Sequence, residues 1–86
     1  MSIKQKIQRI IKTSLDNNNI DFDIDKIVIE TPKEAKNGDY STNIALMLTK
    51  ILKDNPMNIA SKIKDEIKDE SIEKVEIAAP GFINIF

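Results

Sequence analysis

The chain opens with a helical pattern of apolar residues. Ser2 and Gln5, three positions apart, fit a capping box at the start of a helix. Three consecutive asparagines at positions 17–19 predict its end, because asparagine tolerates turn and left-handed conformations. The apolar residues between these signals have the spacing of one buried helix face, and they are Ile3, Ile7, Ile10, Ile11 and Leu15.

A strand and a polar loop are predicted next. The residues at 27–29 form a β-branched run that Pro32 stops, which predicts a strand at about Lys26–Thr31. Residues 32–40 are mostly polar and contain the turn signal Asn37-Gly38, so we expect a loop there.

Two further helices are predicted in the middle of the chain. Ser41 is expected to be the N-cap of the first, and Asn55-Pro56 has the residue types of an N-cap and a first helical position for the second. The first helix is expected to bury Ile44, Ala45, Leu48, Ile51 and Leu52, and the second Ile59, Ala60, Ile63 and Ile67.

The last part of the chain has the pattern of strands. Apolar residues at 72, 75 and 77 are followed by a break at 78–81 and a final strand at Phe82–Phe86. Strands lie outside the two central helices, without the alternation of a parallel sheet. We therefore expect an α+β fold in a single domain over 1–86, with a small, mostly antiparallel sheet of three to four strands covered by about three helices. Because the chain stops within an apolar strand, we also expect it to be a fragment of a larger protein.

Composition removes several classes of function. The chain has no cysteine and no histidine, which takes away disulfides, thiolate metal sites and the commonest general base. No Walker loop, nucleophile elbow or calcium-loop spacing is present. We therefore predict no catalytic residue, no metal site and no cofactor in this chain. No apolar run is long enough for a membrane span and the N-terminus is not a signal peptide, so the cytoplasm is the expected compartment.

The final strand contains the most informative chemistry. Side chains alternate between faces along a strand, so Ile83 and Ile85 share one face while Phe82, Asn84 and Phe86 share the other. On one interpretation the second face binds an unpaired base, with an aromatic ring stacking on it and the amide reading its edge. On the other, both phenylalanines are core residues and the amide bonds to backbone, since burying it unpaired would cost about 1–3 kcal/mol.

Two polar groups upstream are further candidates for nucleic-acid contacts. Residues 38–43, Gly-Asp-Tyr-Ser-Thr-Asn, crowd polar groups at a predicted helix start, where an anion can bind. Asp39 argues against a bare phosphate site, and capping with a tight turn is the better explanation on the residues alone. The net charge is −1, so nucleic-acid binding would need a local basic surface. Lys33 and Lys36, in the loop before Gly38, are the best placed lysines to neutralise phosphates.

Two segments together resemble a known family. Residues 31–63, TPKEAKNGDYSTNIALMLTKILKDNPMNIASKI, are similar to the Gly-Asp-Tyr-(Ala/Ser)-Thr-Asn segment and following helices of arginyl-tRNA synthetases. Residues 72–86, IEKVEIAAPGFINIF, resemble their Pro-Gly-(Phe/Tyr)-Ile-Asn strand. The resemblance covers essentially the whole chain. It departs from the pattern at Asn37, where histidine or glycine is common, and at Ala79, where glycine is common.

The resemblance implies a function in tRNA recognition. In that family the N-terminal domain precedes the catalytic domain and contacts the D-loop at the outer corner of arginine tRNA. The aromatic and amide pair that reads a base there falls on Phe82 and Asn84, and the Gly38 segment adds Tyr40 and Asn43 as candidate contacts. The adenylation motifs of these class I enzymes are missing here. ATP binding and aminoacyl transfer would therefore belong to the catalytic domain of the parent, and the anticodon-binding domain is absent too.

Two other functions remain open on the residues alone. An acyl-carrier-like protein would bear its phosphopantetheine arm on Ser41, at the start of the second predicted helix. A non-catalytic interaction domain would pair its final strand with another chain. For the tRNA-binding alternative we expect a monomer with two partners, the arginine tRNA and the catalytic domain of the same synthetase, and no membrane.

Overall fold

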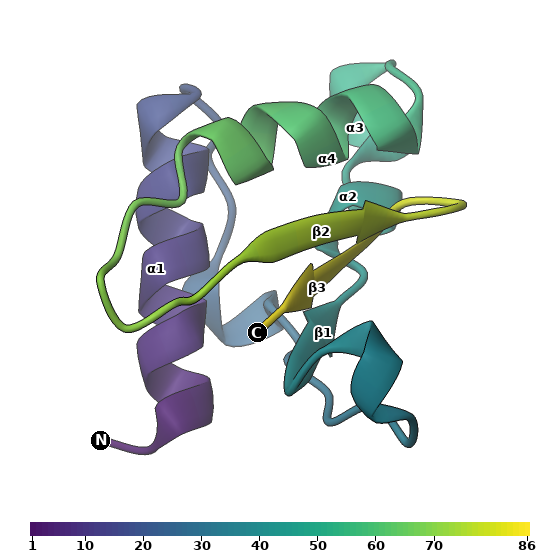
Figure 1. Ribbon diagram of the computed structural model, residues 1–86. Coiled ribbons are helices and arrows are strands. Elements are labelled where there is room, and N and C mark those ends of the chain that lie inside the picture. Colours follow the sequence, from purple (N-terminus) through teal and green to yellow (C-terminus); the bar gives the residue numbers. More distant parts are fainter.

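The computed structural model describes all 86 residues and has the expected α+β architecture (Figure 1). Three strands, β1 (Tyr40–Thr42), β2 (Val75–Ala78) and β3 (Phe82–Ile85), form one antiparallel sheet in the order β1-β3-β2. None of the helices combines the length and the apolar character that crossing a bilayer requires. In chain order the elements are α1 (Ile3–Asn17), the short 3-10 helices η1 (Ile24–Lys26) and η2 (Ala35–Asn37), β1 (Tyr40–Thr42), α2 (Ile44–Met47), α3 (Thr49–Leu52), α4 (Pro56–Asp65), β2 (Val75–Ala78) and β3 (Phe82–Ile85).

Helices cover one face of the sheet. α4 contacts both β2 and β3, α2 contacts β3, and α1 packs beside α4. Ile83 and Ile85 of β3 are buried on this covered face, as their alternation predicted. A buried hydrogen bond also joins α1 to α4, because the Ser14 hydroxyl donates to the Ile63 carbonyl at 2.6 Å. The opposite face, called the open face below, is bordered by the segment before β1, which includes the short η2.

Both predicted ends of α1 and the predicted start of α4 are confirmed. Ser2 and Gln5 exchange the two hydrogen bonds of a capping box at the start of α1. Asn19, just past the end of α1, has a left-handed backbone with φ of 60°. At α4 the Asn55 side chain accepts a bond from the Asn58 N–H, and Pro56 occupies the first turn. The prediction for the apolar stripe of α1 is wrong at Ile3, which is 63% exposed because the first turn extends past the core.

The strand predicted at 26–31 is wrong. The segment is extended and buries Ile27 and Ile29, but its only ladder contact is an isolated bridge between Glu30 and Ser41. Two features explain the lack of pairing. The Ile27 carbonyl accepts a hydrogen bond from the Gln8 side chain of α1 at 2.7 Å instead of one from a strand, and Pro32 has no N–H to continue the ladder.

The single helix predicted from Ser41 to Leu52 is also wrong. Ser41 lies in β1, and the helical region starts only after Asn43. It is then divided into α2 and α3 at Leu48, next to a Thr49 hydroxyl that donates to the Leu46 carbonyl at 3.0 Å and so competes with regular helix bonding. Ile51, expected in the core, is 60% exposed as a result of this break.

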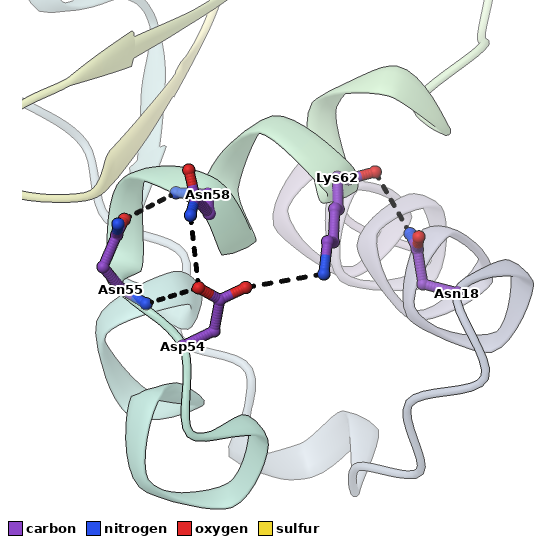
Figure 2. A network of polar contacts seen from close by, with 5 residues as sticks. All are labelled: Asn18, Asp54, Asn55, Asn58 and Lys62. Carbon is purple, nitrogen blue, oxygen red and sulfur yellow. Dashed lines mark hydrogen bonds and ion pairs between the residues drawn. The ribbon is translucent and has the colours of Figure 1, made fainter.

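A polar network fixes the start of α4 (Figure 2). The Asp54 carboxylate accepts hydrogen bonds from the Asn55 N–H at 2.8 Å and the Asn58 side-chain amide at 3.2 Å, and it pairs with Lys62 at 3.5 Å. The Asn18 side chain, at the end of α1, donates to the Lys62 carbonyl at 3.1 Å. The network therefore links α1, α4 and the segment between α3 and α4.

Protonating Asp54 is expected to weaken this network. Its pKa lies below the ordinary value of 3.8, first because of the hydrogen bond from the Asn58 side chain and then because of the Asn55 N–H. A carboxylate with a lowered folded-state pKa stabilises the fold above its unfolded pKa, and this contribution is lost as the pH falls through the folded-state pKa. We expect the free energy of unfolding to fall below pH 3.8, and Asp54→Asn to flatten that fall.

Urea unfolding at a series of pH values between about 5 and 2 measures this effect. Asp21→Asn, which removes an exposed carboxylate outside the network, is the matched control. The same pH slope in Asp54→Asn as in the unsubstituted protein would contradict the assignment.

Candidate functional site

The open face of the sheet carries a hollow of about 290 Å³. It lies where β3 begins, next to the turn from β2. The segment before β1 forms its other side. Its lining residues are Glu30, Pro32, Asn37, Ser41, Ala78, Ala79, Phe82 and Asn84. The hollow therefore brings together the two sequence motifs, which are about forty residues apart, together with a third segment that the sequence did not indicate.

Phe82 and Asn84 lie side by side in this hollow. Phe82 is 36% exposed, so its ring is not a core residue. Asn84 is only 7% exposed, and its Oδ1 accepts a hydrogen bond from the Ser41 hydroxyl at 3.0 Å. Its amide does not bond to backbone, as the core interpretation required, and the Nδ2 group donates to no other group of the chain. Ser41 thus holds the amide in place while its donor end stays free.

A row of polar side chains crosses the open face at Asn84. Ser41 of β1 and Glu76 of β2 are both opposite Asn84 in the sheet register, and Glu30 is bridged to Ser41. Residues that are opposite in register point to the same face, so the row runs Glu30, Ser41, Asn84, Glu76. The sequence reasoning missed Glu30. The signal that could have found it is its alternation with the buried Ile27 and Ile29, which puts Glu30 on the outer face.

The Gly38 segment fastens the loop to β3. The Asp39 N–H donates to the Ile85 carbonyl at 2.9 Å, and Gly38 has φ of 92°. A Cβ at Gly38 would lie 2.7 Å from the Ile85 carbonyl oxygen, so only glycine allows this approach. The close contact positions Asn37 at the hollow. The helix start expected at Ser41, with its anion site, does not exist here because Ser41 belongs to β1.

Tyr40 and Asn43 do not join Phe82 and Asn84. Tyr40 is opposite Ile85 in register and so lies on the helix-covered face, where it packs against the core and lines a second hollow beside α1. Asn43 precedes α2, makes no capping hydrogen bond and has a buried Oδ1 without a partner. For both residues tRNA contact stays a prediction.

Lys33 and Lys36 border the hollow. Both are exposed and belong to the segment whose Pro32 and Asn37 line it. Lys36 pairs with Glu34 at 3.1 Å, an exposed pair that contributes little to stability. For these two lysines phosphate contact stays a prediction.

Acidic side chains are numerous but scattered. No group of three or more carboxylates lies close enough to hold a metal ion. The open-face row contains one amide, one hydroxyl and two carboxylates, which suits hydrogen-bond recognition of a ligand.

Comparisons with known proteins agree with this architecture. The chain is 46% identical over 86 residues to an arginine–tRNA ligase of Staphylococcus epidermidis and 44% identical to one of Staphylococcus aureus, in each case over 98% of this chain and 16% of the relative. The chain therefore spans about a sixth of the length of these relatives.

Solved structures show the same fold. The crystal structure of arginyl-tRNA synthetase from Plasmodium falciparum superimposes with a TM-score of 0.81 at 23% identity, over 96% of this chain and 15% of that one. The Thermus thermophilus arginyl-tRNA synthetase gives 0.81 at 20% identity, over 98% and 14%. The family described as the arginyl tRNA synthetase N terminal domain matches residues 1–86. The whole chain thus belongs to the family of arginyl-tRNA synthetase N-terminal domains.

Proposed function

We propose that this domain binds the D-loop at the outer corner of arginine tRNA and thereby supports aminoacylation by the rest of an arginine–tRNA ligase. The observation that carries the proposal is the pair formed by Phe82 and Asn84. A partly exposed ring and a fixed amide with a free donor lie together at a solvent-open hollow. Stacking plus one edge-directed hydrogen bond is the common way in which proteins read an unpaired base.

The surroundings favour a base over a phosphate in the hollow. The Glu30 carboxylate, which lines the hollow, would repel a phosphate. Phosphates fit better at Lys33 and Lys36, which border the hollow without entering it. With a net charge of −1, the domain depends on this local arrangement, so binding by the isolated chain is expected to be weak and salt-dependent.

The chemistry of aminoacylation is assigned to the part of the enzyme outside this chain. ATP and arginine would bind in a catalytic domain of the same enzyme. That catalytic domain is the second proposed partner of this domain, and the proposed compartment is the cytoplasm. Family membership favours this function over that of an acyl carrier. The position of Ser41 does too, because its hydroxyl is committed to Asn84 within β1 and does not open a helix as a phosphopantetheine site would.

An NMR titration tests the proposal directly. Arginine tRNA is added to the isotope-labelled 86-residue domain, and the backbone signals and the Asn84 side-chain amide signals are followed. We expect the largest shifts at Phe82, Asn84 and the segment 32–38. An arginine tRNA whose D-loop bases are replaced by abasic sites is the control and should leave Phe82 unshifted. Shifts that avoid Phe82 and Asn84 with the intact tRNA would refute the proposal.

A further inference from the structure

The hollow contains a carboxylate to which the proposed function assigns no hydrogen-bonding partner. Glu30 lines the hollow and is exposed, yet it forms no ion pair. Two other exposed carboxylates nearby are paired, Glu34 with Lys36 at 3.1 Å and Glu76 with Lys74 at 3.6 Å. An unpaired negative charge on a surface that binds RNA weakens the attraction for phosphates. We therefore expect Glu30 to contact a different part of the ligand, one that donates a hydrogen bond.

The backbone fixes where Glu30 points. Glu30 and Ser41 exchange two backbone hydrogen bonds, both of 2.8 Å, and Ser41 is opposite Asn84 in the next strand. All three side chains therefore point into the same hollow, with Ser41 in the middle. Because neighbouring strands are about 4.8 Å apart, the segments that carry Glu30 and Asn84 are about 10 Å apart. A flat ligand over Ser41 would have one of these side chains at each end.

The two ends offer opposite hydrogen-bonding groups. Asn84 presents its free Nδ2 donor, because Oδ1 is occupied by the Ser41 hydroxyl. An ionised carboxylate such as that of Glu30 can only accept. The complementary ligand edge has an acceptor at one end and an N–H donor at the other. All four bases have an acceptor beside an N–H donor: in adenine and cytosine the donor is an exocyclic amine beside a ring nitrogen, whereas in guanine and uracil it is a ring N–H beside a carbonyl. A carboxylate accepting from an exocyclic amine is a known direct base contact.

We propose that Glu30 is a specificity-determining residue of the base site. Its carboxylate accepts a hydrogen bond from the exocyclic amine of the base that stacks on Phe82, while the Asn84 amide donates to the neighbouring ring nitrogen. The same charge keeps phosphates out of the hollow. This inference rests on the proposed function, since it assumes that a D-loop base enters the hollow.

The test compares bases that differ only in the amine. Arginine tRNA is assembled with adenosine or purine riboside, and with cytidine or 2-pyrimidinone riboside, at one unpaired D-loop position at a time. Affinities for the 86-residue domain are measured at fixed salt. At the position that is read, we expect the unsubstituted domain to prefer the amine-bearing base about tenfold, as one hydrogen bond to a charged group provides.

Substitutions then assign the preference to Glu30. Glu30→Ala should remove it, and Glu30→Gln should retain part of it because the amide oxygen still accepts. Asp21→Asn, which changes the net charge by the same amount as Glu30→Gln but lies away from the hollow, should keep the preference intact. Circular dichroism checks that each variant is folded.

The outcomes separate this inference from the proposed function. If Phe82→Ala leaves the affinity for every tRNA unchanged, the proposed function fails and this inference fails with it. If Phe82→Ala weakens binding but Glu30→Ala keeps the amine preference, or if the unsubstituted domain has none at any position, only the role of Glu30 is refuted.

Discussion

Replacing Gly38 with alanine is expected to lower the free energy of unfolding by about 2–4 kcal/mol. The substitution combines two costs. The backbone at Gly38 has φ of 92°, which an L-residue rarely adopts, and the new Cβ would lie 2.7 Å from the Ile85 carbonyl oxygen. That oxygen belongs to the central strand and already accepts from the Asp39 N–H, so neither side can move away easily. Chemical unfolding followed by circular dichroism gives the difference.

The neighbouring Asn37 provides the control for Gly38. It is exposed, and Asn37→Ala should change the free energy of unfolding by no more than about 0.5 kcal/mol. Equal stability of Gly38→Ala and the unsubstituted domain would mean that the loop is not held against β3 as described. Gly38→Ala should also weaken tRNA binding, because the loop that Gly38 holds against β3 places Asn37 at the hollow.

Phe82→Ala is expected to weaken tRNA binding by about tenfold to a hundredfold. Stacking of an unpaired base on an aromatic side chain contributes about 1–3 kcal/mol, and Phe82 is the aromatic side chain that lines the hollow. The domain should keep most of its stability, because the ring is partly exposed. Fluorescence anisotropy with labelled arginine tRNA measures the affinity.

Two further variants sharpen this result. Phe82→Tyr preserves a ring and should bind nearly as well as the unsubstituted domain. Phe86→Ala removes a ring that lies outside the hollow, beneath the Lys74 ammonium at 4.4 Å, and should affect binding far less. A loss of affinity in Phe86→Ala equal to that in Phe82→Ala would point to general damage of the strand instead of base stacking.

The fold class, both ends of α1 and the start of α4 could be predicted because they depend on local signals. The capping box at Ser2 and the Asn55-Pro56 start each involve neighbouring residues only, and the alternation in β3 correctly separated Ile83 from Asn84. The strand expected at 26–31 was wrong because pairing depends on distant partners. The Gln8 side chain, far away in sequence, takes the carbonyl of Ile27.

The candidate site was predictable only in part, for a similar reason. Resemblance to a family indicated Phe82 and Asn84. The register of the sheet explains how Ser41, which lies between Asn84 and Glu30, holds the Asn84 amide. Ser41 was expected to start a helix, since serine is a common N-cap. The competing hydrogen bond to Asn84, more than forty residues later, could not be seen in the local pattern. Glu30 differs, because its alternation with Ile27 and Ile29 was a local signal for the outer face, and only its proximity to Asn84 depends on distant pairing.

The order of the strands has a consequence for how the domain forms during synthesis. β3 is the last strand in sequence but the central one in the sheet, and β1 and β2 pair with it and not with each other. While residues 82–85 are still inside the ribosome, the emerging chain can form helices but has no sheet to place under them. The nascent domain therefore exposes apolar helix faces until its final strand inserts, and the sheet face that carries Phe82 and Asn84 is completed in that same step.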